Sequence, residues 1–220
     1  MKMNFEEFFE KYHIQIKNLE QMQTAFTHTS YTNEHHLESY ERLEFLGDAV
    51  LELITSEYFY LNTDLREGDM TKTRASYVCE HALATYAKEI GLNKYIRVGN
   101  GQLDNVNDTI IADVFESVLG AIYLDCGFTV AKEYALNIIV PYIERKEIFL
   151  SDYKSALQEM VQTDKESLSY EIVREEGPAH DKTFEVNVVI DGIVFGTGIG
   201  KSKKEAEQKA ACDAYRKRAR

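Results

Sequence analysis

One stretch of the chain places a column of acids on a helix that must also bury an apolar face: residues 41–50, Glu-Arg-Leu-Glu-Phe-Leu-Gly-Asp-Ala-Val. At about 100° per residue, Glu41, Glu44 and Asp48 fall within roughly 60° of one another. Apolar residues at helical spacing predict a buried stripe on the opposite side: Leu43, Leu46, Val50 and Leu53. Like charges at this spacing destabilise a helix by about 0.2–0.5 kcal/mol per pair, so we expect a cation against the acidic face.

Gly47 lies in the middle of this predicted helix, where glycine is about 1 kcal/mol less favourable than alanine. We therefore expect another backbone or side chain to approach closely at Gly47. Taken alone, a Glu-x-x-Glu pattern is more typical of a solvated acidic face on an ordinary core helix.

A second acidic motif lies more than sixty residues further along the chain, in residues 107–121. Asp113 and Glu116 are i, i+3 neighbours in an otherwise apolar helical pattern. Unpaired carboxylates near a core are unfavourable, so metal coordination explains this pair better than a solvated face does. Hard divalent cations such as Mg²⁺ prefer oxygen ligands of this kind.

These two runs closely resemble the two catalytic helices of the ribonuclease III family. Residues 67–75 resemble the family's Glu-Gly-x-Leu-Thr-x-x-Arg-Ala segment, with Met70 in place of Leu. Residues 27–30 resemble its Thr-His-x-Ser turn, which we interpret as structural. Tyr40 stands where many members carry Asn, a difference that affects local hydrogen bonding rather than the chemistry.

The resemblance implies a set of functional residues and cofactors. It implies two-metal hydrolysis of phosphodiesters with Mg²⁺, for which Mn²⁺ can substitute, leaving 5′-phosphate and 3′-hydroxyl ends. Asp48 and Glu116 are the implied catalytic residues, and Glu116 contributes most to metal binding. Phe45 would contact the second subunit of a homodimer, although core packing is its plainer interpretation. The implied metal ligands are Glu44, Asp48, Asp113 and Glu116, with Glu41 and Glu67 supporting the cleft. Without the resemblance, Glu67 is better explained as an acid at a helix N-terminus.

Charge and composition indicate two domains in a cytoplasmic protein. The 220 residues carry a formal net charge of -12, but acids outnumber bases by almost two to one only in residues 1–150. No β pattern occurs in residues 1–148, so we expect an all-α catalytic domain there and a second domain over 152–220. Within the first domain, a helix is predicted over residues 4–26 and a loop over residues 32–40. No apolar run is long enough for a membrane span, and Cys79, Cys126 and Cys212 follow no metal-binding or disulfide pattern.

The second domain changes from helical to alternating periodicity. A helix is predicted over 152–162, strands over 170–176, 183–190 and 193–200, and a final helix from 201. Asp191-Gly192 is a strong hairpin signal between the last two strands. This α-β-β-β-α order strongly resembles the double-stranded RNA-binding domain. Because A-form RNA is recognised by shape, 2′-hydroxyls and phosphates, polar and basic groups are the candidate contacts. They are Ser155, Gln158, Glu159, Gln162, His180, Lys201, Ser202, Lys203 and Lys204.

Together these features predict an endoribonuclease that cleaves double-stranded RNA, acting in rRNA and mRNA processing. Two alternatives remain open. A non-cleaving, RNA-binding regulator should have lost at least one acid of the cleft, and none is missing. A phosphohydrolase acting on small molecules would not need the RNA-binding domain.

Overall fold

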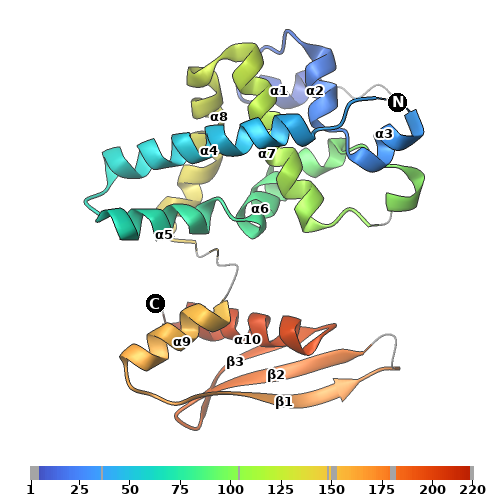
Figure 1. The fold of residues 1–220 in the computed structure, drawn as a ribbon. Helices are drawn as coiled ribbons and strands as arrows, with labels where there is room; N and C mark the ends of the chain where they lie inside the picture. The colour runs from blue at the N-terminus through green and yellow to red at the C-terminus, as the bar shows by residue number, and fades with distance from the viewer. Residues whose placement is uncertain are drawn as a thin grey trace. The chain divides into compact units, whose positions relative to one another are not determined.

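A computed structural model of the chain describes residues 5–35, 37–103, 105–147, 149, 153–178 and 182–218. The chain divides into two compact units, Met1–Phe149 and Leu150–Arg220 (Figure 1). The first unit is helical and the second is an α-β-β-β-α unit, which confirms the predicted fold class. Among the described residues, no helix combines the length and the apolarity needed to cross a bilayer.

The first unit is built from helices and two short 3₁₀ turns (Figure 1). Residues 27 and 97 add an isolated parallel bridge between distant segments. The elements are α1 (Phe5–Glu10), α2 (Leu19–Ala25), α3 (Thr29–His35), α4 (Glu41–Asn62), α5 (Glu67–Tyr77), α6 (Glu80–Ile90), η1 (Leu92–Tyr95), η2 (Asn100–Gln102), α7 (Asp108–Cys126) and α8 (Phe128–Glu144).

Helix α7 is the central element of this unit, and α4 crosses it in direct backbone contact. A β-carbon built on Gly47 would lie 1.8 Å from the carbonyl oxygen of Glu116. A β-carbon on Gly120 would lie 2.4 Å from the carbonyl oxygen of Leu43. The close approach expected at Gly47 is therefore confirmed, and α7 supplies a matching glycine at the same crossing.

The N-terminal region differs from the single helix that its apolar spacing predicts over residues 4–26. The chain leaves α1 through His13, which has a positive φ of 56°. Helix α2 then starts afresh, because the Asn18 side chain accepts a hydrogen bond from the Gln21 amide at 3.0 Å. Such capping satisfies a backbone donor that a continuous helix would pair internally. The loop predicted over residues 32–40 also begins as helix, since α3 continues to His35.

Two expectations about α4 need correction. Leu53 is 57% exposed, whereas Leu43 and Val50 are buried as predicted. The buried stripe continues past Leu53 through Ile54 and Phe59. Leu53 lies at the edge of the stripe and lines a groove between α4 and α5 instead. Glu52, for which the sequence indicates only solvation, forms an ion pair with Arg74 of α5.

The second unit packs two helices on one face of an antiparallel sheet with strand order β1-β2-β3 (Figure 1). Asp191 and Gly192 both have positive φ at the β2–β3 turn, where Ile190 pairs with Ile193. This is the predicted hairpin. The elements are α9 (Tyr153–Thr163), β1 (Leu168–Glu176), β2 (Thr183–Ile190), β3 (Ile193–Gly200) and α10 (Lys203–Arg218).

Small residues allow α10 to lie directly on β3. A β-carbon on Gly196 would lie 2.4 Å from the carbonyl oxygen of Ala210, and one on Gly198 would lie 2.2 Å from the Ala210 amide nitrogen. On the helix, Ala206, Ala210 and Ala214 are fully buried. The three cysteines are free and half-buried.

The crossing predicts that Gly47→Ala destabilises the protein strongly. The added β-carbon would overlap the Glu116 carbonyl oxygen. Neither atom can rotate away, because the backbone fixes both positions. We expect a loss of about 3 kcal/mol or more in the free energy of unfolding, at the upper end for overpacked cores. Gly68→Ala is the matched control, because a β-carbon there meets nothing within 4 Å. Equal melting temperatures for the two variants would contradict the close approach.

Candidate active site

The crossing of α4 and α7 brings the two acidic motifs together. Glu44 and Asp48 lie on either side of Gly47 in the chain, and Gly47 packs on the backbone of Glu116. Asp113 is one turn before Glu116 on α7. Four carboxyl groups from two helices thus share one region of the unit, and their charges act on one another.

The proximity of these acids contributes to the raised pKa values of Glu116 and Glu44. Burial, and then the charges of Asp48, Glu44 and Asp113, raise the pKa of Glu116 to about 8. Burial, Asp113, Glu41 and Asp48 together raise the pKa of Glu44 to about 7. Burial is also the largest cause of the raised pKa values of Asp48 and Asp113. The site therefore holds more negative charge than its own surroundings neutralise.

Tyr40 closes one side of the site. Its phenol donates a hydrogen bond of 2.8 Å to Oδ2 of Asp113, and the residue is only 3% exposed. Burial and the nearby acids raise the pKa of Tyr40, so the phenol stays protonated and remains a donor. The hydrogen bond and the charge of His28 both oppose the rise in the pKa of Asp113. This contact joins residues 73 positions apart, and local sequence spacing carries no signal for it.

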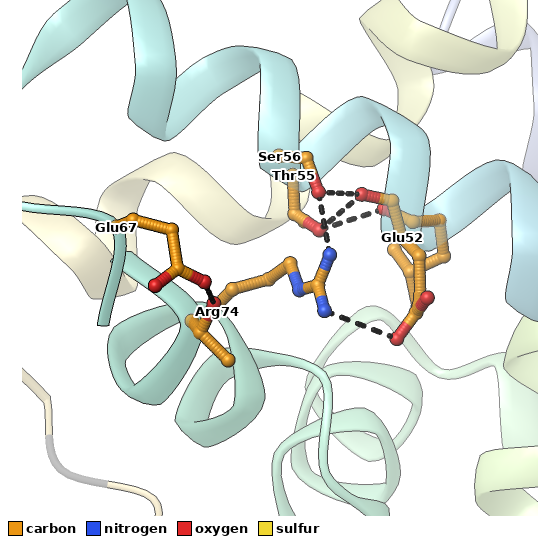
Figure 2. Close-up of polar contacts among 7 residues, drawn as sticks. Glu52, Thr55, Ser56, Glu67 and Arg74 are labelled. Carbon is orange, nitrogen blue, oxygen red and sulfur yellow. Dashed lines mark hydrogen bonds and ion pairs between the residues drawn. The ribbon is translucent and has the colours of Figure 1, made fainter. Parts of the chain in front are cut away.

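A cation lies just beyond the C-terminal end of the acidic column, where Arg74 of α5 reaches Glu52, one turn after Asp48 on α4 (Figure 2). Its Nη2 lies 3.6 Å from Oε1 of Glu52, and its Nη1 donates a 2.7 Å hydrogen bond to Oγ of Ser56. Burial and Glu52 raise the pKa of Asp48, whereas Arg74 lowers it. Arg74 therefore offsets part of the negative charge of Asp48 and Glu52.

The two acids that the sequence predicts to support the cleft are Glu41 and Glu67. Glu41 is exposed and accepts a 2.8 Å hydrogen bond from Ser39. Glu67 is the first residue of α5, and its Oε1 accepts a 3.3 Å hydrogen bond from Thr71 of the same helix (Figure 2). That position fits an acid at a helix N-terminus. It also lines the groove between α4 and α5 together with Leu53, Met70 and Arg74.

The chemistry of the donors fits a hard divalent cation, although their present arrangement does not form a ligand cluster. Over the described residues, no three His, Cys, Asp or Glu side chains are grouped closely enough to hold one ion. The charges of the four acids nevertheless act on one another, and Tyr40 donates to one oxygen of Asp113, which leaves the other oxygen for a ligand. Partly buried carboxylates with raised pKa values are nonetheless the oxygen donors that Mg²⁺ prefers.

Two further groups of predicted residues lie on the second unit. Ser155, Gln158, Glu159 and Gln162 are exposed along one face of α9, opposite the buried Leu157 and Val161. Lys201, Ser202, Lys203 and Lys204 are exposed at the start of α10. There the Glu205 amide donates to Oγ of Ser202 at 3.1 Å, while Oε2 of Glu205 accepts from the Lys201 amide at 2.7 Å. This reciprocal cap fixes the first turn. His180 lies outside the described residues.

Comparisons with known proteins agree with these features. The model of a family described as ribonuclease-III-like matches residues 18–143, and that of the double-stranded RNA binding motif matches residues 153–218. Ribonuclease 3 of Onion yellows phytoplasma is 44% identical over 97% of this chain and 91% of its own length. Ribonuclease 3 of Listeria monocytogenes serovar 1/2a is 44% identical over 97% of each chain. A structure of the nuclease domain of ribonuclease III from Campylobacter jejuni, reported with structural flexibility in a region involved in dimer formation, is 35% identical. It has a TM-score of 0.57 and covers 62% of this chain and 96% of its own.

The raised pKa of Glu116 predicts a pH-dependent penalty in metal-free protein. A carboxyl group whose pKa rises from 4.5 to about 8 on folding is favoured in its protonated form, so stability is lost as the pH rises through about 8. Glu116→Gln should therefore raise the melting temperature at pH 8, corresponding to about 1–3 kcal/mol, and change it little at pH 5. Thermal unfolding in EDTA at both pH values measures this.

The exposed Glu133 on α8 supplies the control, since Glu133→Gln should change neither melting temperature. Adding Mg²⁺ at pH 8 should stabilise the wild type more than Glu116→Gln and so reverse their order. A difference between wild type and Glu116→Gln that is the same at pH 5 and pH 8 would contradict the electrostatic coupling.

Proposed function

This chain belongs to the ribonuclease III family, and from that membership we propose that it is an endoribonuclease that cleaves double-stranded RNA. The single observation that carries the proposal is the coupling of Glu44, Asp48, Asp113 and Glu116 at the α4–α7 crossing. We assign catalysis to residues 1–148 and RNA binding to residues 152–220.

The four coupled acids would hold Mg²⁺, with Mn²⁺ as a substitute, as two ions. Divalent cations held there would supply an activated water and would offset the charge that develops on the transferring phosphoryl group. Asp48 and Glu116 come from different helices, so the crossing of α4 and α7 sets their separation. Glu116 is half-buried, and its raised pKa makes it the acid that gains most from a bound cation. Glu41 and Glu67 would support the cleft from its rim.

The proposed products are RNA ends with 5′-phosphate and 3′-hydroxyl groups. Water must attack phosphorus on the side opposite the 3′ oxygen that leaves. Arg74 keeps α5 against α4 through Glu52 and Ser56 and thereby fixes the groove that Glu67 lines. From family membership we extend the proposal to rRNA and mRNA processing in the cytoplasm.

A homodimer is supported by an unusual exposed aromatic residue. Phe45 follows Glu44 on α4, yet 83% of its surface is exposed. Leu37 and Leu124 are also exposed and line a groove beside Arg42 and Leu46 of the same helix. Large exposed apolar side chains near a site often belong to a protein interface. In a dimer, each catalytic domain would cut one strand of the duplex.

The second unit would bind the duplex. The polar face of α9 offers hydrogen-bonding groups suited to a minor groove, and the lysines at the start of α10 add positive charge to a helix N-terminus. Lys154 joins the two helices, since its Nζ pairs with Glu207 of α10 at 2.5 Å. This ion pair links the two helices that carry the proposed RNA contacts.

Cleavage of a long RNA duplex with Mg²⁺ separates this function from its alternatives. The wild type should cut, and Glu116→Gln should bind the duplex while cutting about 10²–10⁴-fold more slowly, because one ligand of the charge-stabilising site is lost. Gel analysis of products and a binding assay in EDTA measure both. A wild type that binds but never cuts would favour a regulator. Activity on a mononucleotide alone would favour a small-molecule phosphohydrolase.

The basic start of α10 predicts a salt-dependent contribution to binding. Lys203→Ala or Lys204→Ala should weaken duplex binding and lower the slope of log K against log salt concentration by about 1, as expected for one lost phosphate contact. Lys217, at the other end of α10 and paired with Asp213 at 2.7 Å, provides the control. If Lys217→Ala changes the slope as much as Lys203→Ala does, the lysines at the helix start are not the phosphate contacts.

A further inference from the structure

Tyr40 is held more firmly than a loop residue needs to be. Its backbone amide donates a 2.9 Å hydrogen bond to the carbonyl of Thr27, and its own carbonyl accepts the Glu44 amide at 2.9 Å. The ring packs beside His28, with 5.7 Å between the ring centroids. Both the backbone and the ring are fixed, so the phenol oxygen has little freedom to move away from Asp113.

The fixed phenol of Tyr40 contacts a single oxygen of Asp113 on α7. Its hydroxyl donates to Oδ2 of Asp113 at 2.8 Å, across the boundary between α4 and α7. A carboxylate with one oxygen held in this way cannot rotate freely about its side-chain torsions. The second oxygen, Oδ1, is then presented in a fixed direction.

We propose that Tyr40 is the positioning residue for Asp113: it holds Oδ2 so that Oδ1 is directed to the divalent cation. This inference rests on the proposed function, since it concerns the ligands of the same site. Tyr40 also accepts the backbone amide of Glu44, so one residue connects a proposed ligand on α4 to another on α7. Groups that orient metal ligands typically change metal affinity by about 10–100-fold when they are removed.

A purely structural role would give a different result. If the hydrogen bond only satisfied a buried phenol, its loss would lower the melting temperature by a few degrees without acting on metal binding through Asp113. The decisive measurement is therefore metal affinity without RNA, in the full-length protein. Titration with Mn²⁺, followed by the electron paramagnetic resonance of the free ion, gives this affinity directly.

Tyr40→Phe is the sharpest variant, because it removes the hydroxyl and keeps the ring that packs against His28. We expect its affinity for Mn²⁺ to fall about 10-fold, with a metal-free melting temperature within a few degrees of the wild type. Tyr60→Phe is the matched control, since it removes an exposed hydroxyl from the same stretch of chain and should leave Mn²⁺ affinity unchanged.

A double-mutant cycle tests whether Tyr40 acts through Asp113. In an Asp113→Ala background, the added Tyr40→Phe substitution should cause no further loss of Mn²⁺ affinity. A loss of the same size in both backgrounds would overturn the assignment, as would wild-type affinity in Tyr40→Phe alone. If either of these results occurs while the wild type binds Mn²⁺ and cuts duplex RNA, only the role of Tyr40 fails. A wild type that binds no Mn²⁺ overturns both that role and the proposed metal-dependent function.

Discussion

The contact between the α4 and α7 backbones at Gly47 and Gly120 is the constraint on which the site depends. Two helices approach this closely only where neither carries a side chain, and a β-carbon on either glycine would enter the other helix. The acids on each side of the crossing are brought together as a consequence. The helix that forms the centre of the core is thus also the helix that carries Asp113 and Glu116.

Bringing these acids together opposes folding electrostatically, and the surroundings relieve it only in part. Tyr40 donates to Asp113, and Arg74 balances Glu52 and Asp48 at the other end of the column. Every cause that shifts the pKa of Glu116 raises it, so neither a hydrogen-bond donor nor a cation offsets the effect of burial and of the neighbouring acids. A region that stays under-neutralised within a well-packed core is typical of a functional site rather than of a structural ion-pair network.

The sequence predicts the features that depend on local pattern. The three strands, the Asp191-Gly192 hairpin and the close approach at Gly47 follow from periodicity and from glycine chemistry. The failures concern contacts between distant segments. The break after α1 depends on how His13 and Asn18 pack and cap, and the exposure of Leu53 depends on where α5 lies. Helical periodicity places both acidic motifs on helices. It gives no signal that Tyr40 pairs with Asp113, because the two residues are 73 positions apart.

The direct packing of α10 on β3 has a consequence for how the second unit could discriminate between nucleic acids. With Gly196 and Gly198 against Ala210, the helix sits at a height above the sheet that side-chain repacking cannot adjust. The height of the α10 lysines above the sheet is then set by the backbone. Groove spacing differs between A-form and B-form duplexes, so preference for RNA over DNA would arise from helix geometry as well as from 2′-hydroxyl contacts.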